Sequence, residues 1–395
     1  MSRRLIILLA LLVLFLAGAG LWWWLHPEPG PLRLTKVTFA DLPGWAASDP
    51  AAALGAFERS CAALQGKPDA EPLGAAGYAG TVAAWRAPCR AAQAADPVEA
   101  RDFFEHWFTP LAVSAGRIKD GRFTGYYEPE LFVSRRRHGA FQTPIYGRPD
   151  DLVTVDLGQF RPALRGERIA GKIEGGKLVP YASRAEIDAH GLRHAHVLFY
   201  GNDPIAVFFL HIQGSGRVTF EDGSQARVSY AAQNGQLYTA IGKTLIDRGL
   251  PRDGLSMQAI RDWLKAHPDE MHEVIETDAS YVFFQEEPVG DASLGAKGAQ
   301  GVPLTPLASL AVDPRLHALG TPVFVAGGGA LDRLFIAQDI GGAIRGAVRG
   351  DVFFGFGSKA EARAGTMNQM GRMFVLVPKT VAQKLKPRTD FPDSP

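Results

Sequence analysis

From residue 121 onward the sequence consists of short β-branched and aromatic runs that Gly, Pro and Asp-Gly pairs interrupt every few residues. Runs of this length, bounded by turn residues, are typical of strands joined by hairpins. The stretch IAVFFLHIQGSGRVTFEDG, from Ile205 to Gly223, fits this pattern, and strand-like runs resume at TPVFV, RLFIAQ and FVLVP. Most of the chain is therefore predicted to be β structure.

Helical spacing of apolar residues is found in two parts of the chain. Residues 43–111 are rich in alanine and place apolar side chains three and four apart, which predicts two to four helices. Inside the β region, residues 237–249 predict a helix that ends at a glycine, and a second helix is expected from Met257 with Ser256 as its N-cap. The predicted fold class is α+β, mainly β with helices.

The N-terminus carries an apolar segment of membrane-spanning length. Two arginines precede 21 uncharged residues, from Leu5 to Leu25. A helix rising about 1.5 Å per residue would cover the roughly 30 Å hydrocarbon core, with the tryptophans at 22–24 at the far interface. We expect residues 1–31 to be an anchor and a proline-bearing spacer; a signal peptide cleaved after 17–19 is the alternative.

Composition excludes several classes of function. A formal net charge of +1 argues against a nucleic-acid binder, which needs a basic surface. His190, His194 and His196 lie close together, but their spacing matches no standard zinc signature, so no metal site is expected. Nucleotide-binding loops are missing from the sequence too. We therefore expect no cofactor.

Cys61 and Cys89 are the two cysteines of the chain, and both fall in the helical region. In an oxidising compartment two such cysteines can pair, so we expect a disulfide; two buried free thiols are the alternative. At the other end, residues 386–395 are polar and contain proline. This tail is predicted to be disordered.

Three aspartates stand at the ends of apolar runs in the last third of the chain: Asp313, Asp339 and Asp351. Asp339 begins an Asp-Ile-Gly-Gly sequence, whose glycines leave room for a ligand to approach the backbone. Its apolar neighbours would raise the pKa of the carboxyl by desolvation. Taken alone, each aspartate also fits ordinary turn chemistry.

The segment FTGYYEPEL combines hydroxyl groups, aromatic rings and a carboxylate, from Thr124, Tyr126, Tyr127 and Glu128. Such mixtures bind sugars, because rings cover the apolar sugar face while polar groups satisfy its hydroxyls. A tyrosine-rich strand edge is the alternative interpretation.

Seven blocks stand in a fixed order between about residues 121 and 378: FTGYYEPEL, HIQGSGRV, SYAAQNGQLYTAIG, SMQAIRDWL, SYVFF, GVPLTPLASLAVDP and AQDIGGAIRGAVRGDVFFGFG. Together they resemble the membrane-bound lytic murein transglycosylase A family. Several ordered blocks make accidental similarity much less probable than one short motif would. The three strand-end aspartates resemble the trio that names the C-terminal "3D" region of that family.

The resemblance implies a fold and a set of site residues. It implies a double-psi β-barrel from residues 32–128 and 271–385, with an inserted β-barrel-like domain over 129–270 and glycan bound between the two. It assigns the catalytic role to Asp339. The implied substrate-binding residues are Thr124, Tyr126, Gln213, Ser215 and Asp351.

The implied reaction cleaves the β-1,4 bond between N-acetylmuramic acid and N-acetylglucosamine in peptidoglycan, leaving 1,6-anhydromuramic ends, with one aspartate as acid and base. One alternative is a muramidase that uses Asp351 or Asp313 as a second carboxylate; the other is an expansin-like binding protein without catalysis. Family members are often outer-membrane lipoproteins, whereas this sequence has no cysteine near its N-terminus to accept a lipid. We therefore expect an N-terminally anchored protein at the periplasmic face of a bacterial membrane.

Overall fold

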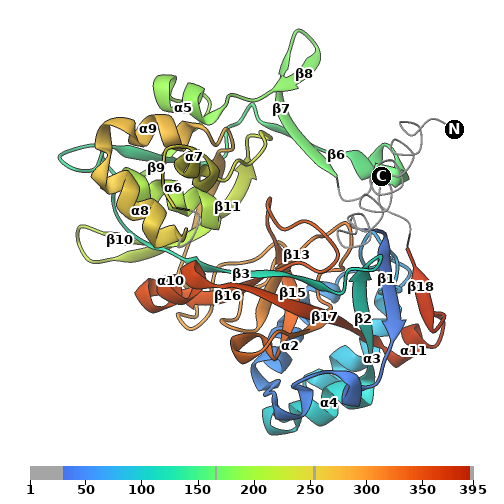
Figure 1. The fold of residues 1–395 in the computed structure, drawn as a ribbon. Coiled ribbons are helices and arrows are strands. Elements are labelled where there is room, and N and C mark those ends of the chain that lie inside the picture. The colour runs from blue at the N-terminus through green and yellow to red at the C-terminus, as the bar shows by residue number, and fades with distance from the viewer. Residues whose placement is uncertain (1–29, 165–166, 252–254, 392–395) are drawn as a thin grey trace, which may run out of the picture.

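The computed structural model describes residues 30–164, 167–251 and 255–391. Figure 1 shows two bodies, a β-barrel with helices packed on its outside and a second β domain that carries its own helices. The predicted anchor lies outside the described residues. Within the three described ranges, no helix is both long and apolar enough to cross a membrane.

The first body is a closed six-stranded barrel. Its strands neighbour one another in the order β14-β15-β13-β16-β3-β17, and β14 pairs with β17 to close the ring. The pairs β13–β15 and β3–β16 are parallel and the other pairs are antiparallel. The expected barrel is therefore present. Its strands are β3 (Asp120–Glu128), β13 (Ser309–Val312), β14 (Pro322–Ala326), β15 (Arg333–Ile340), β16 (Gly350–Phe356) and β17 (Asn368–Pro378).

Three strands extend the barrel sheet at one edge, and helices cover it. Each residue of β13 and β14 is buried, as expected for strands enclosed on both faces. Phe57 of α2 packs against the rings of Trp85, Phe104 and Phe108, which joins α2 to α3, α4 and the added strand β2. The added elements are β1 (Leu32–Lys36), β2 (Phe108–Ala115), β18 (Arg388–Asp390), α2 (Ala51–Leu64), α3 (Val82–Ala92), α4 (Ala100–Trp107), α10 (Gly357–Thr366) and α11 (Lys379–Ala382).

The second body is inserted between β3 and β13. Its six strands follow the order β12-β11-β10-β4-β9-β5, and a bridge between Gly147 and Phe284 brings the two edge strands together, so the sheet is barrel-like. A separate sheet, β6-β7-β8, projects from this domain in Figure 1. The strands are β4 (Glu130–Ser134), β5 (Thr143–Tyr146), β6 (Val153–Asp156), β7 (Arg168–Glu174), β8 (Lys177–Pro180), β9 (Val197–Gly201), β10 (Ser215–Phe220), β11 (Gln225–Gln233) and β12 (Val282–Glu287).

The inserted domain continues past residue 270, where the sequence placed its end. Strand β12 pairs with β11 along six positions, so residues 282–287 belong to the insert. Helix α9 (Pro268–Glu276) packs with α7 (Ile241–Asp247) and α8 (Met257–Ala266) in one apolar cluster around Leu245. A strand whose antiparallel partner lies 49 to 60 residues away leaves no local signal in the sequence, so its domain cannot be assigned from neighbouring residues.

One segment predicted as a strand is a helix. Residues Pro204–Gln213 form α6, which begins where the Asp203 carboxylate accepts from the N–H groups of Ile205 and Ala206. The run has no visible helical period because apolar side chains face both ways: Leu210 packs in the cluster under the sheet, and Phe208 packs in the cluster with α7 and α9. A helix that is buried all round reads as a continuous apolar run.

Three further expectations can be compared with the structure. The two helices in the insert are present, and Ser256 caps α8 by accepting from the Ala259 N–H. The disulfide between Cys61 and Cys89 is formed and joins α2 to α3. The tail is not disordered throughout, because β18 pairs with β1 and Asp390 binds Arg33. Backbone pairing requires no apolar side chains, so the polar composition was misleading.

Candidate active site

Two of the three strand-end aspartates stand in one row across the barrel. Ala311 of β13 is the register partner of Asp339 on one side and of Asp351 on the other, and Asp351 is in turn the partner of Thr124. Directly paired residues project to the same face of a sheet. Because Asp339 and Asp351 are two strands apart, their Cα atoms are separated by roughly 10 Å.

Asp339 accepts two hydrogen bonds from neutral groups. The Tyr126 hydroxyl donates to Oδ2 at 2.8 Å, and the Ala299 N–H donates to Oδ1 at 2.9 Å. Burial raises the pKa of Asp339 above its ordinary value, and these two bonds only partly offset the effect. Burial and the neighbouring carboxyl also raise the pKa of Tyr126, so its hydroxyl stays protonated and continues to donate.

Asp351 is held by a hydroxyl group. The Thr124 Oγ1 donates to Oδ1 at 2.6 Å, and Arg349 donates to the same Thr124 oxygen at 2.8 Å. Burial raises the pKa of Asp351 to about 6, with a smaller contribution from the nearby Asp339, against the opposing effects of Thr124 and Arg349. The row thus contains two carboxyl groups that burial drives toward the protonated form.

Asp313 has a different environment and does not join the row. Its side chain is fully buried, and Arg315 forms an ion pair with it at 2.8 Å while the Gly346 N–H donates to it at 2.9 Å. Burial alone would raise the pKa of Asp313, but these donors outweigh burial and hold the pKa below its ordinary value. Asp313 is therefore a charged structural residue.

The predicted contacts Gln213 and Ser215 lie in the inserted domain. The Gln213 side-chain oxygen accepts from the Tyr127 N–H at 3.0 Å, so Gln213 fastens the end of α6 to β3 beside Tyr126. Ser215 is buried and pairs with Ser229 in the β10–β11 hairpin. The structure thus brings together Thr124, Tyr126, Asp339 and Asp351, connects Gln213 to them through the backbone, and leaves Ser215 inside the insert.

Glu128, which the sequence grouped with sugar-binding side chains, has a structural role. It is fully buried between Arg217, at 3.2 Å, and Arg227, at 2.6 Å. Both guanidinium groups also donate to the Leu294 carbonyl, in the loop that leads from the insert back to the barrel. This cluster therefore ties the two crossings between the domains together, and a sequence cannot distinguish such a carboxylate from a ligand-binding one.

Sequence reasoning missed Tyr238, which faces the row from the inserted domain. A side chain on Gly342, three residues after Asp339, would come within 4.0 Å of the Tyr238 Cβ. Burial raises the pKa of Tyr238 to about 12, with smaller contributions from Asp278 and Asp351. The neighbouring Leu237 is 86% exposed. Tyr238 belongs to the block SYAAQNGQLYTAIG, and the resemblance of that block to the family was the one sequence feature that could have indicated it.

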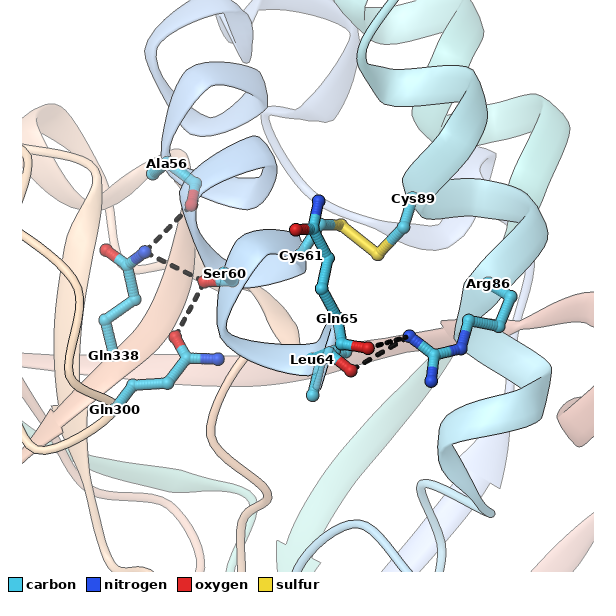
Figure 2. The surroundings of a disulfide bond; sticks show 9 residues. All are labelled: Ala56, Ser60, Cys61, Leu64, Gln65, Arg86, Cys89, Gln300 and Gln338. Carbon is cyan, nitrogen blue, oxygen red and sulfur yellow. Dashed lines mark hydrogen bonds between the residues drawn. A yellow bond between two sulfur atoms is a disulfide. The ribbon is translucent and has the colours of Figure 1, made fainter. Parts of the chain in front are cut away.

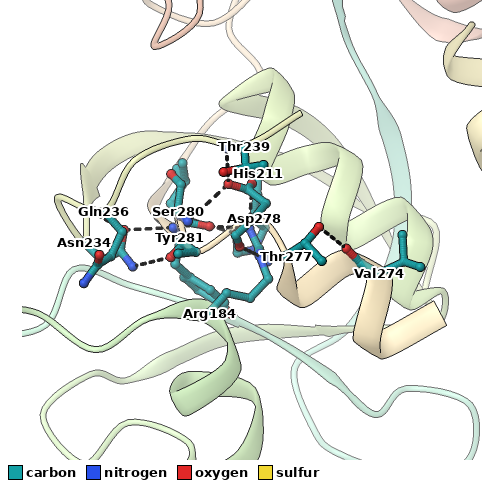
Figure 3. A network of polar contacts seen from close by, with 12 residues as sticks. Arg184, His211, Asn234, Gln236, Thr239, Val274, Thr277, Asp278, Ser280 and Tyr281 are labelled. Carbon is teal, nitrogen blue, oxygen red and sulfur yellow. Dashed lines mark hydrogen bonds and ion pairs between the residues drawn. The ribbon is translucent and has the colours of Figure 1, made fainter. Parts of the chain in front are cut away.

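Leu237 and Tyr238 lie in the segment between Asn234 and Thr239, two residues of the polar network drawn in Figure 3. The Asn234 amide donates to the carbonyls of Ala182 and Ala279 at the start of the segment. The Asp278 carboxylate accepts from the Thr239 N–H at 3.0 Å at its end. Both ends of the segment are thus fixed, so the exposed side chains between them have a defined position.

Among the described residues, no group of three or more His, Cys, Asp or Glu side chains is arranged to hold a metal ion.

Comparisons with known proteins place the chain in a family. The MltA specific insert domain matches residues 122–285, and the 3D domain matches residues 308–377. Membrane-bound lytic murein transglycosylase A of Escherichia coli K12 is 37% identical over 268 residues, which cover 65% of each chain. The chain thus spans just under two thirds of that relative.

Solved structures agree over a longer stretch. A membrane-bound lytic murein transglycosylase from Agrobacterium tumefaciens is 34% identical with a TM-score of 0.77, covering 89% of this chain and 99% of that one. The E. coli MltA structure with bound chitohexaose is 30% identical with a TM-score of 0.60, covering 82% and 90%. The chain belongs to the membrane-bound lytic murein transglycosylase A family.

Proposed function

We propose that this protein is a lytic transglycosylase that cuts peptidoglycan between N-acetylmuramic acid and N-acetylglucosamine, with Asp339 as its acid and base. The observation that carries the proposal is the environment of Asp339: a carboxyl with a raised pKa, held by two donors that are neutral. Because neither donor is a cation, neither holds the carboxyl in its charged form as a guanidinium would, and both can hydrogen-bond the carboxylate that remains after the proton is given up.

The reaction needs one proton to leave Asp339 and one to return. Protonated Asp339 donates to the glycosidic oxygen, and the bond between that oxygen and the muramic acid C1 breaks. The resulting carboxylate takes the proton of the muramic acid 6-hydroxyl, whose oxygen bonds to C1 and closes the 1,6-anhydro ring. Since the nucleophile is part of the substrate, proximity replaces a second carboxylate, and no water is consumed.

The glycan would lie along the aspartate row, facing the insert segment that carries Leu237 and Tyr238. An E. coli relative is described with bound chitohexaose, a β-1,4-linked chain of N-acetylglucosamine. Tyr238 and Leu237 offer an aromatic and an apolar surface for sugar faces, while Thr124 and Asp351 offer polar groups for hydroxyls. Tyr126 contacts Asp339 directly, and Gln213 acts by holding β3 rather than by touching sugar.

The apolar N-terminal segment, residues 5–25, would hold the enzyme at the periplasmic face of the membrane, with glycan strands as its partner. The length of the uncharged run and the names of the relatives, which are membrane-bound, support this assignment. A cleaved signal peptide would give a periplasmic enzyme with the same active site.

A muramidase is the second candidate, and the position of Asp351 favours it. An inverting hydrolase separates its two carboxyl groups by about 6.5–9.5 Å to admit water. Asp351 lies in the same row as Asp339, and its pKa is raised to about 6. In that case Asp351 would activate water, and the product would carry a reducing end.

The Asp339→Asn variant tests the assignment of the acid. The amide keeps the shape and the acceptor oxygen but cannot give a proton, so we expect glycan turnover to fall by at least about 10³-fold. Chitohexaose binding, measured by calorimetry, should be retained. Asp332→Asn is the matched control, because Asp332 precedes the same strand and accepts from the Gly327 and Gly328 N–H groups. Substantial turnover by Asp339→Asn would refute the proposal.

A further inference from the structure

We propose that Ser60, on helix α2, is a positioning residue that holds the Ala299 N–H against the Asp339 carboxylate. The inference rests on the proposed function of Asp339 and extends it to a helix outside the aspartate row. Ser60 contacts neither the proposed substrate path nor Asp339, and it acts through the two residues beside the donor and the acceptor.

The Ser60 hydroxyl links two glutamines. It donates to the Gln300 Oε1 at 2.7 Å and accepts from the Gln338 Nε2 at 2.8 Å. Figure 2 shows the hydroxyl between the two side chains on one face of α2. Ser60 is 1% exposed and Gln338 is fully buried, so the bond between them is shielded from water, where a hydrogen bond contributes most to fixing geometry. Gln300 is half-buried, so its bond to Ser60 is shielded in part.

The two glutamines are the chain neighbours of the groups that meet at the site. Gln300 follows Ala299, which donates to Asp339, and Gln338 precedes Asp339. The Gln300 N–H also donates to the Gln338 carbonyl at 3.0 Å. Three bonds therefore lie in succession between one loop and one strand: the Ser60 bridge, the backbone bond and the bond to the catalytic carboxylate.

The loop that carries Ala299, residues 288–308, joins β12 to β13 and depends on contacts at both ends. Its base is fixed where Arg217 and Arg227 donate to the Leu294 carbonyl. Its tip lies close to β15. A Cβ added to Gly298 would stand 2.6 Å from the backbone carbonyl oxygen of Gln338. The tip therefore has little room to move toward the strand, and the Ser60 bridge opposes movement away from it.

Helix α2 is itself held firmly beside the strand. The Gln338 amide donates to the Ala56 carbonyl, one turn before Ser60, at 2.8 Å. The next residue, Cys61, forms the disulfide with Cys89 of α3 on the other side of α2 (Figure 2). Ser60 is thus fixed by covalent and hydrogen-bonded neighbours, as a residue that positions a catalytic group should be.

The consequence for catalysis follows from the donor. The Ala299 N–H lowers the pKa of Asp339 against the larger opposing effect of burial. If the loop tip drifts, this bond weakens and the pKa of Asp339 rises further. Because the acid must be protonated to act, the alkaline limb of the pH–rate profile would then move to higher pH. A carboxyl with a higher pKa is also a weaker acid, so it would protonate the glycosidic oxygen less readily.

The test compares Ser60→Ala, Gln300→Ala and the double variant in the full chain. We expect each single variant to lower kcat by roughly 5- to 10-fold, as loss of one buried hydrogen bond implies, with KM little changed and the alkaline limb shifted upward. The kcat of the double variant should be no lower than that of the single variants, because all three variants lack the hydrogen bond between Ser60 and Gln300. Ser48→Ala is the control: Ser48 is also buried and donates to the Trp45 carbonyl.

Amide hydrogen exchange over residues 296–304 gives a readout that needs no activity. Faster exchange at Ala299 in Ser60→Ala and Gln300→Ala, but not in Ser48→Ala, supports the inference. Unchanged exchange and an unchanged pH profile in both variants would overturn it. If Ser60→Ala fails to fold, Gln300→Ala decides the question, since it leaves α2 intact. If the wild type releases no glycan product, the proposed function is wrong. The exchange result still tests whether Ser60 positions the Ala299 N–H.

Discussion

The ends of strands β13 and β15 show how differently one fold can treat two aspartates. The strands pair in parallel, Asp313 follows the first directly, and Asp339 lies near the end of the second. Burial would raise the pKa of both carboxyl groups. Arg315 and the Gly346 N–H reverse that effect for Asp313, whereas Asp339 receives two neutral donors and keeps a raised pKa.

The difference teaches that burial alone does not identify an acid. A buried carboxyl that receives a guanidinium stays charged and contributes to stability, whereas one that receives a hydroxyl and an amide can be protonated. Asp351 belongs with Asp339 in this respect, because Thr124 is its direct donor and its pKa is raised to about 6. Three aspartates that look alike in the sequence thus divide into two whose pKa values are raised and one whose pKa is lowered.

The largest expected difference is in stability. Asp313→Asn removes the buried carboxylate that Arg315 and the Gly346 N–H hold. Arg315 is 29% exposed and keeps Glu167 as a partner, so we expect the free energy of unfolding to fall by about 1–3 kcal/mol, as for a lost charged hydrogen bond. Denaturant unfolding with an unchanged m-value would measure this loss. The fraction that remains folded should keep its activity, since Asp313 lies outside the row. A variant as stable as the wild type would contradict the structural role.

Asp351→Asn should show the opposite pattern. The amide removes a carboxylate that burial disfavours, so stability at neutral pH should be unchanged or higher. We expect release of soluble glycan from sacculi to fall by about 10- to 100-fold, equivalent to roughly 1.4–2.7 kcal/mol, because substrate contact is lost but the acid remains. A loss as complete as that of Asp339→Asn would instead indicate a second catalytic carboxylate.

The pH dependence of the free energy of unfolding should distinguish Asp351 from Asp313. The folded-state pKa of Asp351 is about 6, above the unfolded value near 4, so the folded protein binds more protons in that window. Its contribution is greatest below about pH 4 and is lost as pH rises through 6, by up to roughly 3 kcal/mol for two pKa units. Asp313, whose pKa is lowered, loses its contribution only as pH falls below 4. Unfolding curves of Asp351→Asn between pH 4 and 7 should show a smaller decline than those of the wild type, because Asp339, whose pKa is also raised, remains.

Local patterns predicted those features that depend on local chemistry. The cap at Ser256, the helices before residue 111 and the disulfide partners could be predicted because neighbours in sequence or composition encode them. Ordered family blocks predicted Asp339 and its neighbours Thr124 and Tyr126, which the structure brings together. The alternative in which Asp339 merely caps a turn is disfavoured by its two donors from distant segments.

Features that depend on distant partners could not be predicted. Glu128 resembled a ligand-binding carboxylate until Arg217 and Arg227 were found around it. The α6 helix is buried on all sides, so its apolar run had no period. Ala299 contributes only its backbone N–H, and any residue type other than proline can do so. The sequence therefore indicates the proposed acid and its donor Tyr126, but not its backbone donor Ala299.

The most direct test of the central claim is mass spectrometry of muropeptides released from purified sacculi in water enriched in ¹⁸O, using the part of the chain after residue 31. Intramolecular transfer with Asp339 as acid and base predicts 1,6-anhydro ends that carry no ¹⁸O, formed by the wild type and by Asp332→Asn but not by Asp339→Asn. Reducing ends that carry ¹⁸O would contradict the account and identify a hydrolase with a second carboxylate.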